Sequence, residues 1–456
     1  MKLIYLPVEV KSRELISKLF FIANNINENF VFFIGDKLAT KNATSSLGKG
    51  IYFYKSINWY DTPHIQRIKN NGNRYVSLDE EGGVTQSNKS NLQSILDRRS
   101  SEENVSLVDK IFTWGNFDYE GWRNKYKNYS NKIVKTGSPR FDLWRSDVFH
   151  KIFKEEIFYL KKYSPFFFIP STFINSYEWL SKEIAHEKKI HEGNNKETLD
   201  FLKRRIQQNK DSYKSFLAYV EMIKKLTKDF PKHKIIIKPH PKENIFDWQR
   251  QFKQKKYSNV LVDNNFDLTA YIAASECVIF TETLAGIQSI IMGKKTISYN
   301  LKNTETLRNF ANKCSPQTKN YKTLLKYLHK NSLNENLKYK KKIKERFYIS
   351  KKTSSKIIMQ QIKNIKTSEI NMFFFNLKIR IYSLYYLVLD EIKYFFGEIK
   401  KIILKQSDFK SYSIKMSGGI KRKDVEKIFK NLRLINKVKI INFGKNGYII
   451  YKNNLI

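Results

Sequence analysis

Short apolar runs alternate with helical segments through the first 330 residues, and this alternation most constrains the fold. It begins with "LIYLPVEV" (3–10), an apolar run typical of a buried strand. "SRELISKLFFIANNI" (12–26) follows, with a serine N-cap and helical apolar spacing. Later strand-like runs include "RYVSLD" (74–79) and "VDKIFTWG" (108–115). Such alternation predicts a mostly parallel sheet with helices on both faces.

The same alternation starts again after residue 160. "SPFFFIPST" (164–172) and "HKIIIKPHP" (233–241) predict strands, and a long helix is predicted between them at 212–230. We therefore predict an α/β fold with two Rossmann-like domains facing a cleft, over residues 1–150 and 151–350. This arrangement is common in transferases that use a nucleotide-linked donor.

The last third of the chain has a different character. Residues 370–405 are aromatic and basic, and their longest unbroken apolar run, "LYYLVL", is too short to cross a bilayer. We expect this segment to lie on a surface, either that of the two domains or that of an anionic membrane. Residues 418–453 predict one helix and a hairpin that turns at "FGKNG". We therefore expect residues 351–456 to form a helical, basic tail with a small αββ end.

Charge and cysteine content bound the function. The chain has 84 Lys and Arg against 43 Asp and Glu, a net charge of +41 that favours polyanionic partners. Lys, Ile and Asn are abundant throughout, so the charge reflects a general bias and no nucleic-acid partner is expected. Two separate cysteines indicate neither a disulfide framework nor a thiolate metal site. With no signal-peptide pattern in the first ten residues, we expect a cytoplasmic protein, soluble or peripheral on the inner face of the cell membrane.

An acidic turn, "SLDEEGGV" (77–84), gathers three carboxylates directly after a predicted strand. One interpretation is a solvated loop. The other is a catalytic carboxylate at the carboxyl end of a strand, where open α/β sheets place their ligands.

A second segment, "KIIIKPHPKEN" (234–244), follows the same logic. Its buried run delivers Lys238 and His240 to a strand end, and Pro239 and Pro241 fix the backbone on both sides of the imidazole. An imidazole beside an ammonium suits a phosphate ligand. The alternative is a turn that caps the strand and carries an incidental histidine.

A third segment, "FTETLAGIQSIIMGKKTISY" (280–299), leaves a predicted strand and opens a helix. Thr281, Glu282 and Thr283 stand where N-terminal helix amides can receive a phosphate. An ordinary capped helix would also place Thr and Glu here.

Together the three segments resemble a family. "EEG" (80–82) and "HP" (240–241) match motifs of bacterial sialyltransferases and related enzymes that use CMP-linked acidic sugars, and "TET" (281–283) stands where those often have a Ser/Thr pair. More closely, roughly residues 1–330 resemble the surface carbohydrate biosynthesis protein family, which is glycosyltransferase-like and of the two-domain B type. The segments that carry this resemblance are "IYLPVEVKSREL" (4–15), "KGIYFYKS" (49–56), "DEEGG" (79–83), "FTWG" (112–115), "TGSPRFDLW" (136–144) and "KPHPKEN" (238–244).

The resemblance implies a glycosyltransferase of capsule or lipopolysaccharide assembly. It makes Glu80 or Glu81 the catalytic carboxylate and His240 a donor-phosphate ligand or proton donor. The donor-binding residues it implies are Lys238, His240, Pro241, Thr281, Glu282 and Thr283. Glu282 departs from the usual Ser/Thr pair, which leaves its role open. One role for its carboxylate is to accept a hydrogen bond from a ribose hydroxyl. The partners are then a nucleotide sugar, a glycan or lipid-linked glycan acceptor, and an anionic membrane surface.

Two other functions remain open on the sequence. One is a polyol-phosphate transferase that uses CDP-glycerol or CDP-ribitol, and the other is a non-catalytic basic binding protein on the same scaffold. No Asp-x-Asp metal motif stands at a predicted strand end. We therefore expect a metal-independent reaction with no cofactor and no metal site.

Overall fold

The computed structural model describes residues 1–81, 92–93, 96–97, 99–173, 196–241, 243–300, 309–330, 333–404, 416 and 418–453. Gly82 and Gly83 of the acidic turn and Lys242 of the histidine segment lie outside these residues. The chain divides into two compact units. Met1–Ile152 with Lys344–Ile456 form the first, and Phe153–Ile343 the second.

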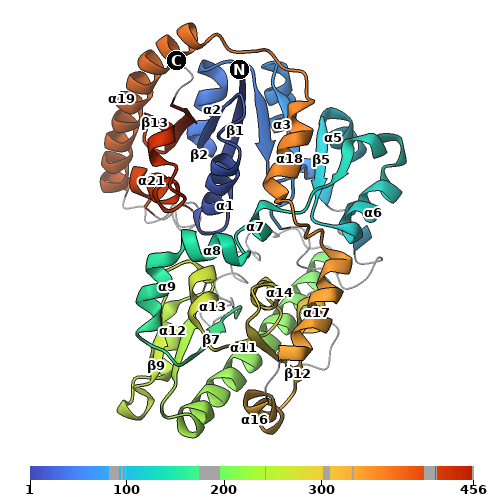
Figure 1. Cartoon of the computed structure of the whole chain (residues 1–456), viewed down its shortest axis with the longest axis vertical. Helices are drawn as coiled ribbons and strands as arrows, with labels where there is room; N and C mark the ends of the chain where they lie inside the picture. Colours follow the sequence, from blue (N-terminus) through green and yellow to red (C-terminus); the bar gives the residue numbers. More distant parts are fainter. Residues whose placement is uncertain are drawn as a thin grey trace. The chain divides into compact units, whose positions relative to one another are not determined.

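The first unit contains an eight-stranded sheet in the order β13-β14-β2-β1-β3-β4-β5-β6 (Figure 1). The six N-terminal strands are parallel, and the C-terminal hairpin β13–β14 adds to β2 in antiparallel fashion. The strands are β1 (Lys2–Val8), β2 (Phe30–Asp36), β3 (Ile51–Tyr54), β4 (Arg74–Leu78), β5 (Lys110–Thr113), β6 (Ile133–Lys135), β13 (Val438–Phe443) and β14 (Gly447–Lys452).

Helices cover the sheet of the first unit, and local sequence sets their ends. Asp36 begins α2 by accepting a hydrogen bond from the backbone N–H of Ala39 over 2.7 Å, and Pro63 occupies the first turn of α3. Strands such as β1 and β2 are buried on both faces, which is why they read as nearly continuous apolar runs. The helices are α1 (Lys11–Asn24), α2 (Lys37–Ser46), α3 (Thr62–Asn70), α5 (Glu102–Leu107), α6 (Asn116–Lys125), α7 (Pro139–Asp142), α8 (Ser146–Ile152), α18 (Ser354–Lys363), α19 (Met372–Leu404) and α21 (Arg422–Asn431).

The C-terminal segment packs into the first unit. At Gly115 an added Cβ would lie 2.1 Å from the carbonyl oxygen of Arg346, so only glycine permits this approach of the returning chain. Asp142 then caps α18, because its carboxylate accepts hydrogen bonds from the backbone N–H groups of Ser354 (2.8 Å) and Ser355 (2.9 Å). Figure 1 shows α19 beside the hairpin and α2.

The second unit contains a six-stranded parallel sheet in the order β12-β11-β10-β7-β8-β9. Strand order runs outward in both directions from β7, so the order reverses between β7 and β10. This is the Rossmann arrangement. The strands are β7 (Phe166–Pro170), β8 (Lys234–Lys238), β9 (Val260–Val262), β10 (Cys277–Phe280), β11 (Lys295–Tyr299) and β12 (Gln317–Thr318).

The core of the second unit lies between this sheet and its helices, with Phe167, Ile235, Trp248 and Ile279 among its buried residues. The helices are α9 (Lys154–Lys161), α11 (Lys196–Asp229), α12 (Ile245–Gln251), α13 (Leu268–Ala274), α14 (Leu284–Ile291), α15 (Asn309–Asn312), α16 (Tyr321–His329) and α17 (Leu333–Arg346), which ends in the first unit. The prediction of an α/β chain with two Rossmann-like domains and a helical C-terminal segment ending in a hairpin is therefore confirmed.

Candidate functional site

Ligands of open α/β sheets bind beyond the carboxyl ends of the strands. In the first unit the acidic turn follows β4 at this edge. In the second unit the histidine segment follows β8, and Thr281–Thr283 follows β10. The residues predicted for the site therefore lie at the expected edge of their own sheet, with Glu80 and Glu81 in the first unit and the others in the second.

Glu80 is almost fully enclosed. Its residue is 7% exposed, and its Oε2 has no hydrogen-bond partner among the described residues. Burial raises the pKa of Glu80, and the nearby Glu14 carboxylate raises it further, against Lys18 and Arg140. A buried carboxylate with a bare oxygen at this edge of a sheet has the properties of a general base.

Glu81 is in a different environment. It is half-exposed and held by two guanidinium groups, Arg13 at 2.9 Å and Arg99 at 2.7 Å. Partial burial raises the pKa of Glu81, but the two ion pairs outweigh this effect and lower the pKa to about 2. Both oxygens of Glu81 are therefore occupied, which distinguishes it from Glu80.

Arg13 also binds Glu14, with 3.0 Å between its Nη2 and Oε1 of that carboxylate. Glu14 is fully buried and also receives the Lys18 ammonium at 2.9 Å. Arg13 of α1 and Arg99 therefore balance the charge of Glu81, while Arg13 and Lys18 balance that of Glu14. The sequence could not show the pairing of Glu81, because its partners are distant along the chain.

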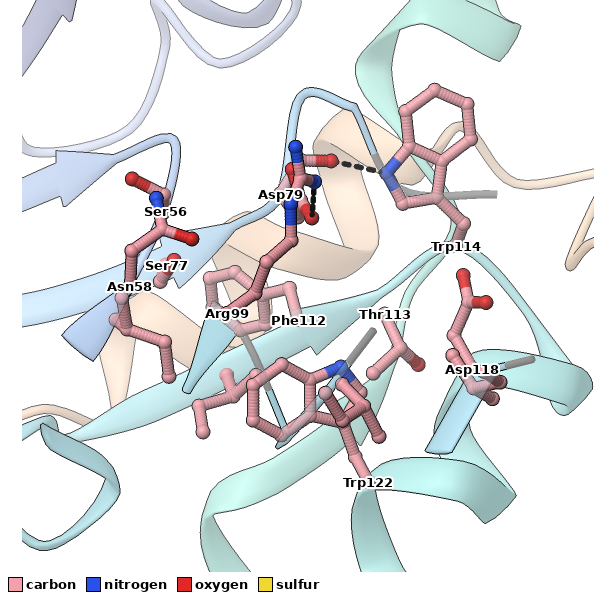
Figure 2. Close-up of a pocket in the computed structure, with 14 residues that line it drawn as sticks. Ser56, Asn58, Ser77, Asp79, Arg99, Phe112, Thr113, Trp114, Asp118 and Trp122 are labelled. Atoms are coloured by element: carbon pink, nitrogen blue, oxygen red, sulfur yellow. Dashed lines mark hydrogen bonds and ion pairs between the residues drawn. The ribbon is translucent and has the colours of Figure 1, made fainter. Parts of the chain in front are cut away.

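The third acid, Asp79, lines a pocket with Arg99, Trp114, Asp118 and Trp122, among other residues. Figure 2 shows the two contacts to Asp79: the indole N–H of Trp114 donates to its carbonyl over 2.6 Å, and Arg99 binds its carboxylate over 3.2 Å. Burial raises the pKa of Asp118 to about 6, against the pull of the Arg346 guanidinium. The pocket therefore places two acids, a guanidinium and two indole rings beside the acidic turn. Sequence reasoning did not identify this pocket.

In the second unit, Lys238 and His240 make different contacts: the Lys238 side chain binds the protein itself, whereas His240 accepts a hydrogen bond through its backbone carbonyl. The Lys238 ammonium donates to the carbonyl of Phe266 over 2.9 Å and lies 5.1 Å from the ring centre of Tyr271. It thereby supports the segment after β9. His240 is half-buried, and its carbonyl accepts a hydrogen bond from the backbone N–H of Glu243 over 2.7 Å. Pro241, the next residue, is exposed.

Glu243, which sequence reasoning did not single out, lies three residues after the predicted site residue His240. Its Oε2 accepts hydrogen bonds from the Ser171 hydroxyl (2.5 Å) and the Trp248 indole (2.8 Å), while its Oε1 has no partner among the described residues. Burial raises the pKa of Glu243 to about 7. Its only sequence signal is its place three residues after His240.

Thr281, Glu282 and Thr283 lie beside the point where the strand order reverses. Glu282 has a φ of 48°, a left-handed conformation that is rare outside glycine, and its N–H donates to Asn312 Oδ1 over 2.8 Å. Thr283 caps α14 through the N–H of Ala285. The Thr172 hydroxyl, just after β7, donates to the carbonyl of Thr281 over 3.4 Å. The ends of β7 and β10 therefore meet at this point.

Within the described residues, no group of three or more His, Cys, Asp or Glu side chains is placed to hold a metal ion. At the start of α14 in the second unit, the chain offers hydrogen-bond donors: backbone N–H groups and threonine hydroxyls. Such groups can receive a phosphate.

A scan against protein-family models and a search of curated proteins each found no match. Among solved structures, MnaA of S. aureus in complex with UDP is similar over 81% of this chain and 100% of that one, at 11% identity and a TM-score of 0.48. UDP-GlcNAc 2-epimerase of Neisseria meningitidis bound to UDP-GlcNAc matches over 80% and 100%, at 12% identity and a TM-score of 0.45. The wall teichoic acid polymerase TagF soaked with CDPG matches over 79% and 88%, at 12% identity and a TM-score of 0.47. The chain is therefore similar in structure, at low sequence identity, to UDP-GlcNAc 2-epimerases and to a wall teichoic acid polymerase.

Proposed function

We propose that this protein is a glycosyltransferase that moves an acidic sugar from a CMP-linked donor to a precursor of a surface polysaccharide or lipopolysaccharide. The observation that carries the proposal is Glu80, a buried carboxylate with a bare Oε2 at the carboxyl end of β4. The choice of a CMP-linked donor comes from the resemblance of the acidic turn and the His-Pro segment to enzymes that use such donors.

In the proposed reaction Glu80 is the general base. Its carboxylate takes the proton of an acceptor hydroxyl as the oxygen attacks the anomeric carbon of the donor. The bond between that carbon and the phosphate oxygen breaks, and CMP leaves with the bonding electrons. A base with a raised pKa accepts this proton more readily than an ordinary carboxylate.

The second unit is proposed to bind the nucleotide. The strand order reverses beside Thr281–Thr283, and nucleotides bind at such points in Rossmann sheets. The amides and hydroxyls at the start of α14 would receive the phosphate, with His240 as a further ligand or proton donor.

The first experiment identifies the nucleotide. Melting temperatures are measured with CMP, CDP, UDP and GDP, and CMP should stabilise most. A ligand at 100 times its dissociation constant adds about 2.7 kcal/mol to the free energy of unfolding. His240→Ala should reduce this stabilisation without changing the melting temperature of the free protein.

The second experiment tests the base. Glu80→Gln should lower CMP release from a CMP-linked acidic sugar by about 10²–10⁴-fold in the presence of a glycan acceptor, with stabilisation by CMP unchanged. Glu81→Gln is the matched control and should lose less, because Glu81 is paired with two arginines. Full activity of Glu80→Gln would remove Glu80 from the mechanism. A product that carries phosphorus from a CDP-linked donor would instead identify a polyol-phosphate transferase.

A further inference from the structure

Helix α19 has two faces of different character. Phe375 and Ile379 on its inner face are buried in the core of the first unit, and Tyr382 packs against the same core. The Tyr386 hydroxyl lies 2.8 Å from the hydroxyl of Ser46 in α2. The backbone N–H of Lys445, in the hairpin turn, donates to the Asp390 carboxylate over 3.0 Å. The helix is thus attached to the first unit by contacts from Phe375 to Asp390.

The outer face of α19 is apolar and open. Six of its exposed apolar residues recur at intervals of four, four, three, four and four, which places them in one line along the helix. Each is between 47% and 75% exposed. We call this line the apolar stripe: Phe373, Leu377, Ile381, Leu384, Val388 and Ile392. It runs about 29 Å, from 19 steps of 1.5 Å.

Cations border the apolar stripe. Lys378 lies on one side of it and Arg380 on the other, both are exposed, and neither pairs with an acid among the described residues. The two acids near its end are both engaged: Asp390 accepts the N–H of Lys445, and Glu391 lies 3.7 Å from the ammonium of Lys445. With Lys445 included, three described cations stand against these two acids, so the border of the apolar stripe is net positive.

We propose that the apolar stripe inserts into the surface of an anionic lipid bilayer, with α19 parallel to the membrane and Lys378 and Arg380 at the lipid phosphates. An apolar face with cations at its margins is the pattern of an interfacial helix. An exposed apolar surface this long calls for a partner. The proposal is independent of the proposed function.

By length and composition alone, Met372–Ile392 is long and apolar enough to cross a membrane, contrary to the expectation from its short unbroken apolar runs. Crossing would require Phe375 and Ile379 to leave the core and the contacts with Ser46 and Lys445 to break. Insertion along the surface keeps all of these contacts. The packing of the inner face therefore favours the parallel orientation.

A second copy of the chain is the other possible occupant. Pairing two copies through the apolar stripe would bring two sets of bordering cations together, on chains that each carry a net charge of +41. An anionic bilayer supplies the opposite charge instead. Charge thus favours the membrane.

The test uses the full chain and sedimentation with vesicles of phosphatidylcholine, with and without phosphatidylglycerol. The wild type should sediment with the anionic vesicles, and less so as salt is raised. The double variant Leu377→Glu/Leu384→Glu should lose this binding by about tenfold or more, at an unchanged melting temperature, because both side chains are exposed. Lys378→Gln/Arg380→Gln should weaken binding and flatten its salt dependence.

Leu337→Glu is the matched control. Leu337 is a similarly exposed leucine on another helix, and this variant should bind like the wild type. Orientation is read from Ile381→Cys carrying an environment-sensitive fluorophore, since the native Cys277 and Cys314 are buried. Lipid-attached quenchers that lie about 5–10 Å below the bilayer surface should quench this fluorophore most strongly. Quenching strongest at the bilayer centre would overturn the parallel orientation. Wild type that stays in solution with both vesicle types, or self-association abolished by the double variant without vesicle binding, would overturn the proposal.

Discussion

The Ser171 hydroxyl donates a hydrogen bond to Oε2 of Glu243 over 2.5 Å and thereby joins the ends of β7 and β8. The Trp248 indole donates to the same oxygen, so Glu243 is held from two sides. Its own N–H holds the carbonyl of His240. The backbone that presents His240 is thus held by the N–H of Glu243, whose carboxyl group is itself held by Ser171 and Trp248.

This arrangement gives a pH-dependent stability. Burial raises the pKa of Glu243 from 4.5 to about 7, so the folded protein binds its proton more tightly than the unfolded chain. The resulting stability is fully present below pH 4.5 and is lost as pH rises through 7. Glu243→Gln keeps an oxygen that can accept both hydrogen bonds and cannot ionise. Relative to wild type, it should gain on the order of 1–3 kcal/mol between pH 5 and pH 8.

Urea unfolding at both pH values measures this difference. Asp247→Asn, on the adjacent helix, removes a carboxylate that pairs with Arg250 over 2.8 Å, and it provides the comparison. A constant difference between Glu243→Gln and wild type across the range would mean that Glu243 ionises as an ordinary surface carboxyl.

The cap of α18 should contribute strongly to the stability of the first unit. Asp142→Ala removes the acceptor for two buried N–H groups and the Ser355 hydroxyl, which lies 2.6 Å from Oδ2. We expect a loss of about 1–3 kcal/mol in the free energy of unfolding. Asp147→Ala, which removes an exposed carboxylate 3.4 Å from Arg145, should stay within about 0.5 kcal/mol of wild type. Equal effects of the two variants would contradict the capping role.

Strands such as β1, β4, β7 and β8 could be predicted because most of their residues are buried and read as apolar runs. The order in which these strands lie beside one another in the sheets could not be predicted in the same way. The hairpin β13–β14 was predicted from its turn, but its place beside β2 depends on tertiary packing, where Gly447 lies opposite Gly35. An added Cβ at Gly447 would lie 2.8 Å from the Phe33 ring. No local pattern in the sequence encodes that approach.

The candidate site was predictable to the same extent. The acidic turn and His240 could be identified because each follows an apolar run that ends a strand. The difference between Glu80 and Glu81 arises from Arg13 and Arg99, which no spacing in the sequence connects to the turn. Glu243 was missed because its burial comes from Ser171, 72 residues earlier in the chain.

Gly286 should be intolerant of a side chain. It lies inside α14, where an added Cβ would be 2.2 Å from the Phe280 ring. Alanine stabilises a helix by up to about 1 kcal/mol relative to glycine, but overpacking a core costs about 1–3 kcal/mol. Gly286→Ala should therefore lower the melting temperature. In Phe280→Leu/Gly286→Ala the loss should be smaller than the sum of the single losses, because leucine leaves room for the methyl group. Additive losses would rule out this clash.

The last prediction concerns the pH dependence of the reaction. A general base acts only when ionised, so the rate should rise with pH through the pKa of Glu80. Burial raises that pKa, and the acid limb of kcat/KM should therefore lie above 4.5, the ordinary value for glutamate. The Arg140 guanidinium, which lies near Glu80 and donates to its carbonyl over 3.4 Å, works against this shift. Arg140→Gln should consequently move the acid limb to higher pH. Glu81→Gln should keep the limb, whereas the residual activity of Glu80→Gln should lack it. An acid limb that survives in Glu80→Gln would assign the titration to another group and remove Glu80 as the base.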